Sequence, residues 1–450
     1  MTDPATRSPA LLDPKVLRLA REVRAEVAEA LASQNPSHRT GDSDGETSTE
    51  QLAQVLISRA LGRRLASLSA AGGNAPGPAE EQAVARLVLA MLFGLGVLQL
   101  FIEDPAVENI DVNGADLAFV SFADGTKQMV GPVAESDEEL VAVVRAAAAR
   151  FGLAERRFDS AQPELDLRLP DGSRLSAVMA VTERPVIDIR RHRLSDHDLG
   201  DLVLLGMLDE ELASFLGAAV RAKRNILVSG AMNAGKTTLL RALAAEIPAD
   251  ERIVTIEQAL ELGLDKQANR HPDCVAMEAR LANIEGVGAI SMAQLVRRSL
   301  RMNASRVIVG EVLGDEVIPM LNAMSQGRAG SMGTIHADSS VGVFRRLAAY
   351  AVQSPERLPL EATNLLIAGS IHFVVHVDVA EVPGELRRLR QVTSVREVID
   401  AEGPMIVSNE IWKPGPTGRA RPSAPLRDVT AAALAGQGYD GRRFANGRLR

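Results

Sequence analysis

The run GAMNAGKT at residues 230–237 constrains the fold of this chain more than any other feature. It satisfies the pattern G-x-x-x-x-G-K-[ST], and its flanks fit that pattern. The apolar run NILVS precedes it as a strand would, and TLLRALAAEI follows it with the pattern of a helix. A glycine-rich turn between a strand and a helix directs backbone N–H groups at one point, where they bind an anion. The motif therefore predicts a phosphate-binding loop, here called the P-loop.

The P-loop predicts ATP and Mg²⁺ as ligands. Lys236 is expected to reach the β- and γ-phosphates, and the Thr237 hydroxyl is expected to ligate Mg²⁺. The predicted nucleotide-binding residues are Gly230, Ala231, Met232, Asn233, Ala234, Gly235, Lys236, Thr237 and Thr238.

Three further strands are expected to end on polar side chains after the P-loop. The run RVIVGEV ends with Glu311, RIVTIEQ carries Glu257, and GSMGTIHADS carries His336. Groups at the carboxyl ends of parallel strands face the ligand site of an α/β sheet. Glu311 is the candidate general base, because a carboxylate at that place can polarise water or hold the hydration shell of a metal. Any one of the three could equally be an ordinary polar residue at a strand end.

The pattern along the chain predicts an α/β fold in several parts. Short apolar strands alternate with helical segments over residues 201–400, which indicates a mostly parallel sheet covered on both faces. Residues 81–200 contain a helix, short strands and Asp-Gly turns, as in a small α+β domain. We expect residues 1–80 to form a mobile helical appendage, dispensable for ATP hydrolysis, with a first flexible linker at residues 35–49 and a second at residues 70–81. Residues 401–450 are expected to be a partly disordered extension with one short helix near residues 428–435.

Composition narrows the function classes. The formal net charge of -8 argues against a protein that coats nucleic acid, so no direct nucleic-acid partner is expected. The single cysteine, Cys274, excludes an intramolecular disulfide and fits a reducing cytoplasm. The N-terminus lacks the pattern of a signal peptide. The longest apolar run, residues 87–102, is too short to span a bilayer, so we expect no transmembrane segment and membrane association only through a partner.

Four segments in fixed order resemble the type II/IV secretion ATPase superfamily. They are NILVSGAMNAGKTTLLRAL, ERIVTIEQALEL, ARLANIEGVGAISMAQLVRRSLRMNASRVIVGEVLGDE and GSMGTIHADS. In that family these are the Walker A loop, an acidic box, a Walker B strand ending in Glu, and a histidine box. Upstream, EDPAVENIDVNG and RLPDGSRLSAV are similar to family patterns, so the resemblance covers about residues 84–400. The chain looks most like the CpaF-type ATPases of tight-adherence pili.

This resemblance implies a RecA-like P-loop domain and a homo-hexameric motor that drives pilus assembly or secretion. It implies that Glu257 and Glu311 are the catalytic acidic residues and that His336 senses the nucleotide. It also implies that Arg174 and Arg190 of the preceding domain approach the γ-phosphate when the domains close, as arginine fingers do. The motor would lie in the cytoplasm, peripheral to the inner face of the membrane, and would act on an inner-membrane platform protein.

Four positions depart from the family pattern. Asn233 replaces a Gly, although Asn tolerates left-handed backbone conformations. Gln258 replaces an Asp, Leu313 replaces an Arg, and Arg328 replaces a His. Two alternatives therefore stay open beside the pilus motor. One is the ATPase of a type IV secretion or conjugation apparatus, and the other is a nucleotide-gated scaffold with little hydrolysis.

Overall fold

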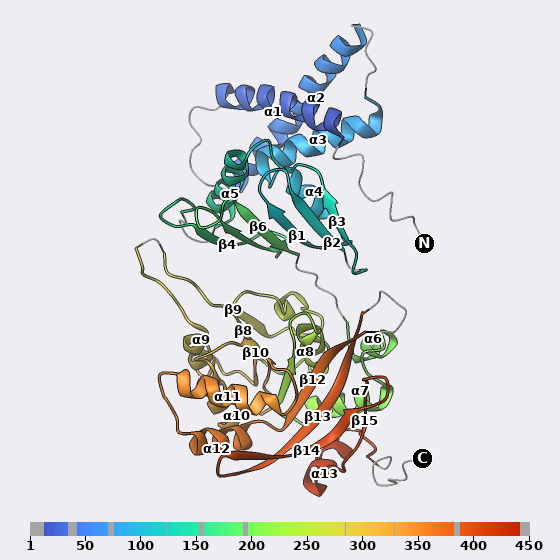
Figure 1. Ribbon diagram of the computed structural model, residues 1–450, viewed down its shortest axis with the longest axis vertical. Helices are drawn as coiled ribbons and strands as arrows, with labels where there is room; N and C mark the ends of the chain where they lie inside the picture. The colour runs from blue at the N-terminus through green and yellow to red at the C-terminus, as the bar shows by residue number, and fades with distance from the viewer. Residues whose placement is uncertain are drawn as a thin grey trace. The chain divides into compact units, whose positions relative to one another are not determined.

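The computed structural model contains two compact units, residues Met1–His192 and Arg193–Arg450 (Figure 1). It describes residues 13–34, 43–70, 76–122, 124–152, 157–191, 197–283, 285–327, 329–381 and 388–441. Each unit has its own sheet, the first unit has one hydrophobic core and the second has two, and each unit is described below by itself.

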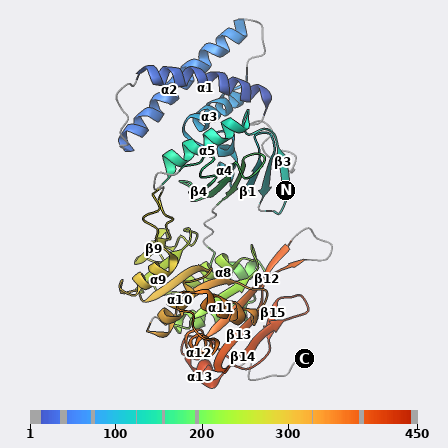
Figure 2. The ribbon, with the colours of Figure 1, turned by 60° about the vertical axis from the view of Figure 1, so that its left-hand side comes forward.

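The first unit is an antiparallel sheet with helices on one face (Figure 2). Its strands lie in the order β3-β2-β1-β6-β5-β4. Buried and exposed residues alternate along β4, β5 and β6, as expected for strands with one face in the core. Its helices are α1 (Pro14–Gln34), α2 (Ser43–Ala70), α3 (Pro78–Phe93), α4 (Val97–Glu103) and α5 (Asp137–Phe151). Its strands are β1 (Val107–Asn113), β2 (Ala118–Phe122), β3 (Lys127–Val130), β4 (Glu164–Arg168), β5 (Arg174–Val178) and β6 (Val186–Arg190).

The apolar run at residues 87–102 forms the end of α3, a turn and α4. The turn contains Gly96, whose φ of 59° lies in the left-handed region. Among the described residues no single helix is long and apolar enough to cross a membrane, and α3 and α4 would pass that test only as a pair bent by 107°.

The prediction of a mobile appendage at residues 1–80 is wrong for the helices. Val23 and Val27 of α1 and Ile57 of α2 belong to the same buried core as Val84 and Leu87 of α3. The reason is the apolar stripe of α1, which cannot remain in water and is covered by α3. Helix α2 also begins earlier than expected, inside the predicted first linker. The rest of that linker, residues 35–42, and residues 71–75 of the second lie outside the described residues.

The second unit is built on a sheet with the order β15-β14-β13-β12-β7-β11-β10-β8-β9. Its helices are α6 (Leu199–Leu204), α7 (Glu210–Arg221), α8 (Lys236–Ala244), the 3-10 helix η3 (Leu264–Lys266), α9 (Met292–Ser299), α10 (Val317–Ser325), α11 (Gly342–Gln353), α12 (Leu360–Ser370) and α13 (Asp428–Ala435). Its strands are β7 (Ile226–Gly230), β8 (Ile253–Glu257), β9 (Cys274–Glu278), β10 (Arg306–Val312), β11 (Met332–His336), β12 (Phe373–Glu381), β13 (Arg388–Glu402), β14 (Met405–Pro414) and β15 (Ala420–Pro422).

Strands β12, β7, β11, β10, β8 and β9 are parallel, which confirms the expected α/β fold. Every residue of β7 and β8 is buried, because helices cover both faces of the sheet. One core contains side chains of α6, α7 and α8, and another contains side chains of α9 to α12. The carboxyl ends of the parallel strands therefore meet at one edge, where the P-loop begins.

The prediction that residues 401–450 form a partly disordered extension is wrong for residues 401–422. Strands β14 and β15 continue the sheet beyond β13 by antiparallel pairing. Trp412 of β14 is fully buried against Phe215 of α7, with ring centroids 4.4 Å apart. Tyr439 packs edge-on against the same Phe215 ring. The short helix predicted near residues 428–435 coincides with α13. Strands β14 and β15 are not predicted, because the many Pro, Arg and Gly residues of this stretch obscure the strand pattern. Residues 442–450 lie outside the described part.

We expect Val23→Asp in α1 to destabilise the first unit by about 2–4 kcal/mol, because it places an unpaired carboxylate in the core. The matched control is Ala25→Asp on the exposed side of the same helix. Hydrogen exchange of residues 76–191, followed in urea, measures the effect. Equal protection in both variants would show that α1 is a detached appendage after all.

Candidate functional site

The P-loop lies at the end of β7 and adopts the backbone that its sequence predicts. A Cβ atom at Gly230 would lie 2.3 Å from the Val377 carbonyl oxygen, so only glycine fits between β7 and β12. Asn233 and Gly235 have φ angles of 60° and 97°, both in the left-handed region. The expectation that Asn233 tolerates this conformation in place of Gly is confirmed. Helix α8 begins at Lys236, so its N-terminus faces the loop.

Lys236 holds its ammonium group inside the P-loop. The side chain is 7% exposed, and its Nζ donates a hydrogen bond of 2.9 Å to the Ala231 carbonyl oxygen. The same Nζ lies 3.2 Å from Nδ1 of His336 and 3.8 Å from Oε1 of Glu311. A carbonyl oxygen of the loop thus binds the ammonium in the way that a phosphate oxygen would.

Glu311 and His336 complete this cluster from the neighbouring strands. Nε2 of His336 lies 3.0 Å from Oε1 of Glu311. His336 stands directly beside Gly230 in the pairing of β11 with β7. The Thr334 hydroxyl donates to the Gly310 carbonyl oxygen at 2.6 Å, which joins the ends of β11 and β10. A carboxylate, an imidazole and an ammonium group therefore meet at the mouth of the P-loop.

Glu257 occupies the end of β8, but its carboxylate turns toward its own loop. Oε2 accepts hydrogen bonds from the backbone N–H groups of Glu261 at 2.7 Å and Leu262 at 2.9 Å. The side chain is buried beside Gly310, where an added Cβ would lie 2.8 Å from the Glu257 Cγ atom. Glu257 is thus next to the strand that carries Glu311, and these two bonds order the loop that follows β8.

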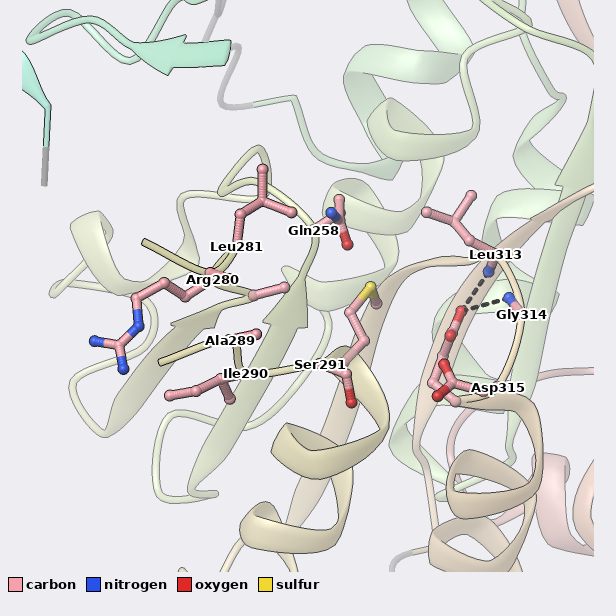
Figure 3. Close-up of a pocket in the computed structure, with 13 residues that line it drawn as sticks. Gln258, Arg280, Leu281, Ala289, Ile290, Ser291, Leu313, Gly314 and Asp315 are labelled. Atoms are coloured by element: carbon pink, nitrogen blue, oxygen red, sulfur yellow. Dashed lines mark hydrogen bonds between the residues drawn. The ribbon is translucent and has the colours of Figure 1, made fainter. Parts of the chain in front are cut away.

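A hollow of about 370 Å³ adjoins the ends of β8 and β10 (Figure 3). Figure 3 shows Gln258 and Leu281 on one side and Leu313 on the other. Gln258 and Leu313, two of the departures from the family pattern, therefore line the same hollow, and Leu313 is 45% exposed. Burial raises the pKa of Glu316, whose carboxylate accepts hydrogen bonds from the backbone of the turn after β10. Arg328, another departure, lies outside the described residues.

Arg174 and Arg190 belong to the first unit, where they are direct neighbours. They stand opposite each other in the pairing of β5 with β6. Both lie on the face of the sheet that alternates with the buried Leu175 and Ile189, and Arg168 of β4 continues the same row. Directly opposed residues have Cβ atoms about 4.5–5.5 Å apart, so the arginines form one basic strip.

The residues of the P-loop fit a nucleotide polyphosphate with its magnesium ion. The cradle at Gly230, the left-handed turns and the buried ammonium are complementary to phosphate oxygens. Within the described residues no three His, Cys, Asp or Glu side chains are grouped as a metal site. Mg²⁺ that is shared with phosphates needs few protein ligands, and Thr237 in the first turn of α8 is the residue that would hold it.

The amino-acid sequence alone does not reveal two contacts of the P-loop region. Nδ1 of His376 on β12 lies 2.9 Å from the Ser229 hydroxyl on β7. Nε of Arg390 on β13 donates a hydrogen bond of 2.9 Å to the Asn233 carbonyl oxygen in the P-loop. No local pattern reveals the second contact, since the two residues are far apart in the sequence and meet only through strand pairing.

The family model described as "Type II/IV secretion system protein" matches residues 94–381. This chain belongs to that family. A putative conjugal transfer protein of Mycobacterium tuberculosis is 33% identical over 362 residues, which cover 78% of this chain and 97% of that protein. The type IV secretion system protein VirB11 of Brucella suis is 28% identical over 339 residues, covering 69% and 92%.

A solved structure of the ATPase DotB from Legionella pneumophila has a TM-score of 0.50 to this chain at 18% identity. The match covers 69% of this chain and 81% of the DotB chain. At this identity the match is evidence for the fold alone. The RecA-like fold and the secretion ATPase family that the motifs predicted are thus confirmed. Assignment to the tight-adherence pilus group stays a prediction.

We expect Gly230→Ala to lower ATP affinity by about tenfold or more, because about 1.4 kcal/mol of loop distortion suffices for that change. The new Cβ would meet a backbone atom that cannot move aside. Gly369→Ala is the control, since that position in α12 has nothing within 4 Å and an alanine is favoured in a helix. Binding of a fluorescent ATP analogue measures both variants. Unchanged affinity in Gly230→Ala would contradict the close packing of β7 on β12.

Proposed function

We propose that this protein is an ATP-hydrolysing motor of a bacterial secretion, conjugation or pilus system. The observation that carries the proposal is the cluster of Lys236, His336 and Glu311 at the mouth of the P-loop. The cluster unites a phosphate-binding cation with a carboxylate that can accept a proton, and family membership supports the same reading.

The reaction is hydrolysis of ATP to ADP and phosphate. Backbone N–H groups of the P-loop and Lys236 bind the phosphates, and Glu311 accepts a proton from the attacking water. His336 contacts both Glu311 and Lys236. Because a γ-phosphate would bind beside these two residues, we propose that His336 senses its presence. Mg²⁺, held through Thr237, would neutralise phosphate charge when bound. Glu257, at the end of the neighbouring strand β8, is the second acidic residue of the proposed site, and its two hydrogen bonds order the loop after β8.

Work would come from closure of the two units around ATP. We propose that Arg174 and Arg190 approach the γ-phosphate in the closed state and stabilise the charge of the transferred phosphoryl group. Their placement abreast on one sheet face supports this role, since a single anion can contact both guanidinium groups.

The functional assembly is proposed to be a homo-hexamer at the cytoplasmic face of the inner membrane. Its partner would be a membrane platform protein that receives the movement. The named relatives favour a conjugal transfer or type IV secretion apparatus as a second candidate beside a pilus system. Pilin and platform genes near the coding gene would favour the pilus, whereas relaxase and coupling-protein genes would favour conjugation.

A scaffold that binds ATP with little hydrolysis is the alternative suggested by Gln258 and Leu313. Both residues line a hollow beside the catalytic strands, where the family pattern has charged side chains. A phosphate-release assay with purified protein, with and without lipid, separates the two functions. Sustained release that needs Lys236 supports the motor, and tight ATP binding without release supports the scaffold.

Lys236→Ala should weaken binding of both ADP and ATP by about 10- to 100-fold, the range of a lost charge-assisted hydrogen bond. The control is Lys266→Ala, which removes an exposed lysine of the same unit. Calorimetry with both nucleotides and an unfolding scan check the result. Tight ATP binding by a folded Lys236→Ala protein would contradict the assignment of residues 230–237 as the phosphate-binding loop.

Arg174→Ala and Arg190→Ala should each slow ATP hydrolysis by about 10³-fold while ADP affinity changes little, because ADP lacks the γ-phosphate. Arg→Lys should restore little, since an ammonium group lacks the planar fork of a guanidinium. The control is Arg157→Ala, which removes an exposed arginine of the first unit. Hydrolysis at the parent rate in both alanine variants would make the two arginines structural.

A further inference from the structure

The hairpin of β12 and β13 lies along the strand that leads into the P-loop. Residues 373–377 of β12 pair in parallel with residues 226–230 of β7. Strand β13 pairs with β12 on the far side, with Arg390 opposite Val379. From this register the Arg390 side chain reaches across to the P-loop.

Arg390 touches the P-loop in two ways. Its Nε donates a hydrogen bond of 2.9 Å to the Asn233 carbonyl oxygen. Its aliphatic stem packs on Gly235, where an added Cβ would lie 3.3 Å from the Arg390 Cδ atom. The side chain is therefore held by the loop at both its stem and its charged end.

The hydrogen bond fixes the orientation of one peptide group. The carbonyl of Asn233 and the N–H of Ala234 belong to the same trans peptide, so they point in opposite directions. The Ala234 N–H donates a hydrogen bond to the Ala231 carbonyl oxygen, with 3.3 Å between nitrogen and oxygen, and the same oxygen accepts from Lys236 Nζ. Arg390 thus holds the Ala234 N–H toward the place where the Lys236 ammonium is bound. A guanidinium on the carbonyl also polarises the peptide and strengthens its N–H as a donor.

This peptide needs such support, because it follows a residue in a disfavoured conformation. Asn233 has a φ of 60°, in the left-handed region that residues with a side chain seldom adopt. A conformation of this kind persists when the surrounding structure determines it from several sides. The bond from Arg390 is one such determinant, and it acts from outside the loop.

We propose that Arg390 is a positioning residue of the nucleotide site, which aims the Ala234 N–H at the β-phosphate of a bound nucleoside di- or triphosphate. The inference rests on the proposed function of the P-loop. Arg390 acts through the P-loop and not through the γ-phosphate, so a change at Arg390 should alter the affinities for ADP and ATP alike. The proposal also makes strand β13 part of the nucleotide site.

The test compares Arg390→Met, Arg390→Lys and Arg390→Ala. Methionine keeps an unbranched apolar stem without a donor, whereas lysine keeps a charged donor. Arg345→Ala, on the exposed side of α11, is the control. We expect Arg390→Met and Arg390→Ala to weaken binding of ADP and ATP equally, by about tenfold. Arg390→Lys should recover most of the affinity, and KM for ATP should rise more than kcat falls.

Two measurements distinguish positioning from general loss of stability. Fluorescence of Trp412, the only tryptophan, reports unfolding of the second unit, and its midpoint should not change in Arg390→Met. Amide exchange at residues 233–235 of the nucleotide-free protein should accelerate in that variant. Parent-like ADP affinity in Arg390→Met, an effect on ATP alone, or unchanged amide exchange would each overturn the inference. The proposed function fails separately, if Lys236→Ala also binds nucleotide like the parent.

Discussion

The carboxamide of Asn225, buried at the start of β7, sets the register on which the nucleotide site depends. Its Nδ2 donates to the carbonyl oxygens of Met324 and Ser370, and its Oδ1 accepts from the N–H groups of Gly330 and Ser331. All four hydrogen bonds that an amide can make are thus used. They tie the first residues of β7 to the chain entering β11 and to the ends of α10 and α12. A shorter or apolar side chain would leave these four backbone groups, which belong to three segments, unsatisfied in the core.

The register that is set at the start of the parallel strands also determines which residues lie side by side at their carboxyl ends. Burial lowers the pKa of His372 to about 4, so its ring stays neutral at neutral pH and Nδ1 accepts the Asn225 N–H. That bond aligns β12 with β7, and β11 is aligned on the other side. As a result Gly230 stands between His336 and Val377, which brings the imidazole to Lys236 and leaves no room for a side chain at Gly230. The chemistry at one edge of the sheet follows from polar contacts at the other.

Sequence alone predicts the parts of the site that are encoded by short segments. The P-loop, Glu311 and His336 could be proposed because each lies at the end of an apolar strand with a recognisable pattern. The orientation of Glu257 was not predictable, since two backbone N–H groups of its own loop decide it. Arg390 was missed because its contact depends on the register of a long-range hairpin. The strands after residue 401 were missed because they are stabilised by pairing and by Trp412 packing, which a local composition rich in Pro and Gly conceals.

The strands after residue 401 are joined to the site through β13. Ser394 of β13 lies 2.8 Å from the Ser340 hydroxyl in the segment after His336, and it donates to Glu410 of β14 at 2.6 Å. Arg390 of the same strand binds the P-loop. One strand thus contacts the segments that follow both β7 and β11. Because β13 is held in turn by β14, a shift of either segment must be accommodated by the C-terminal strands. The frame of the nucleotide site therefore includes the part of the chain whose sequence looked least like a folded domain.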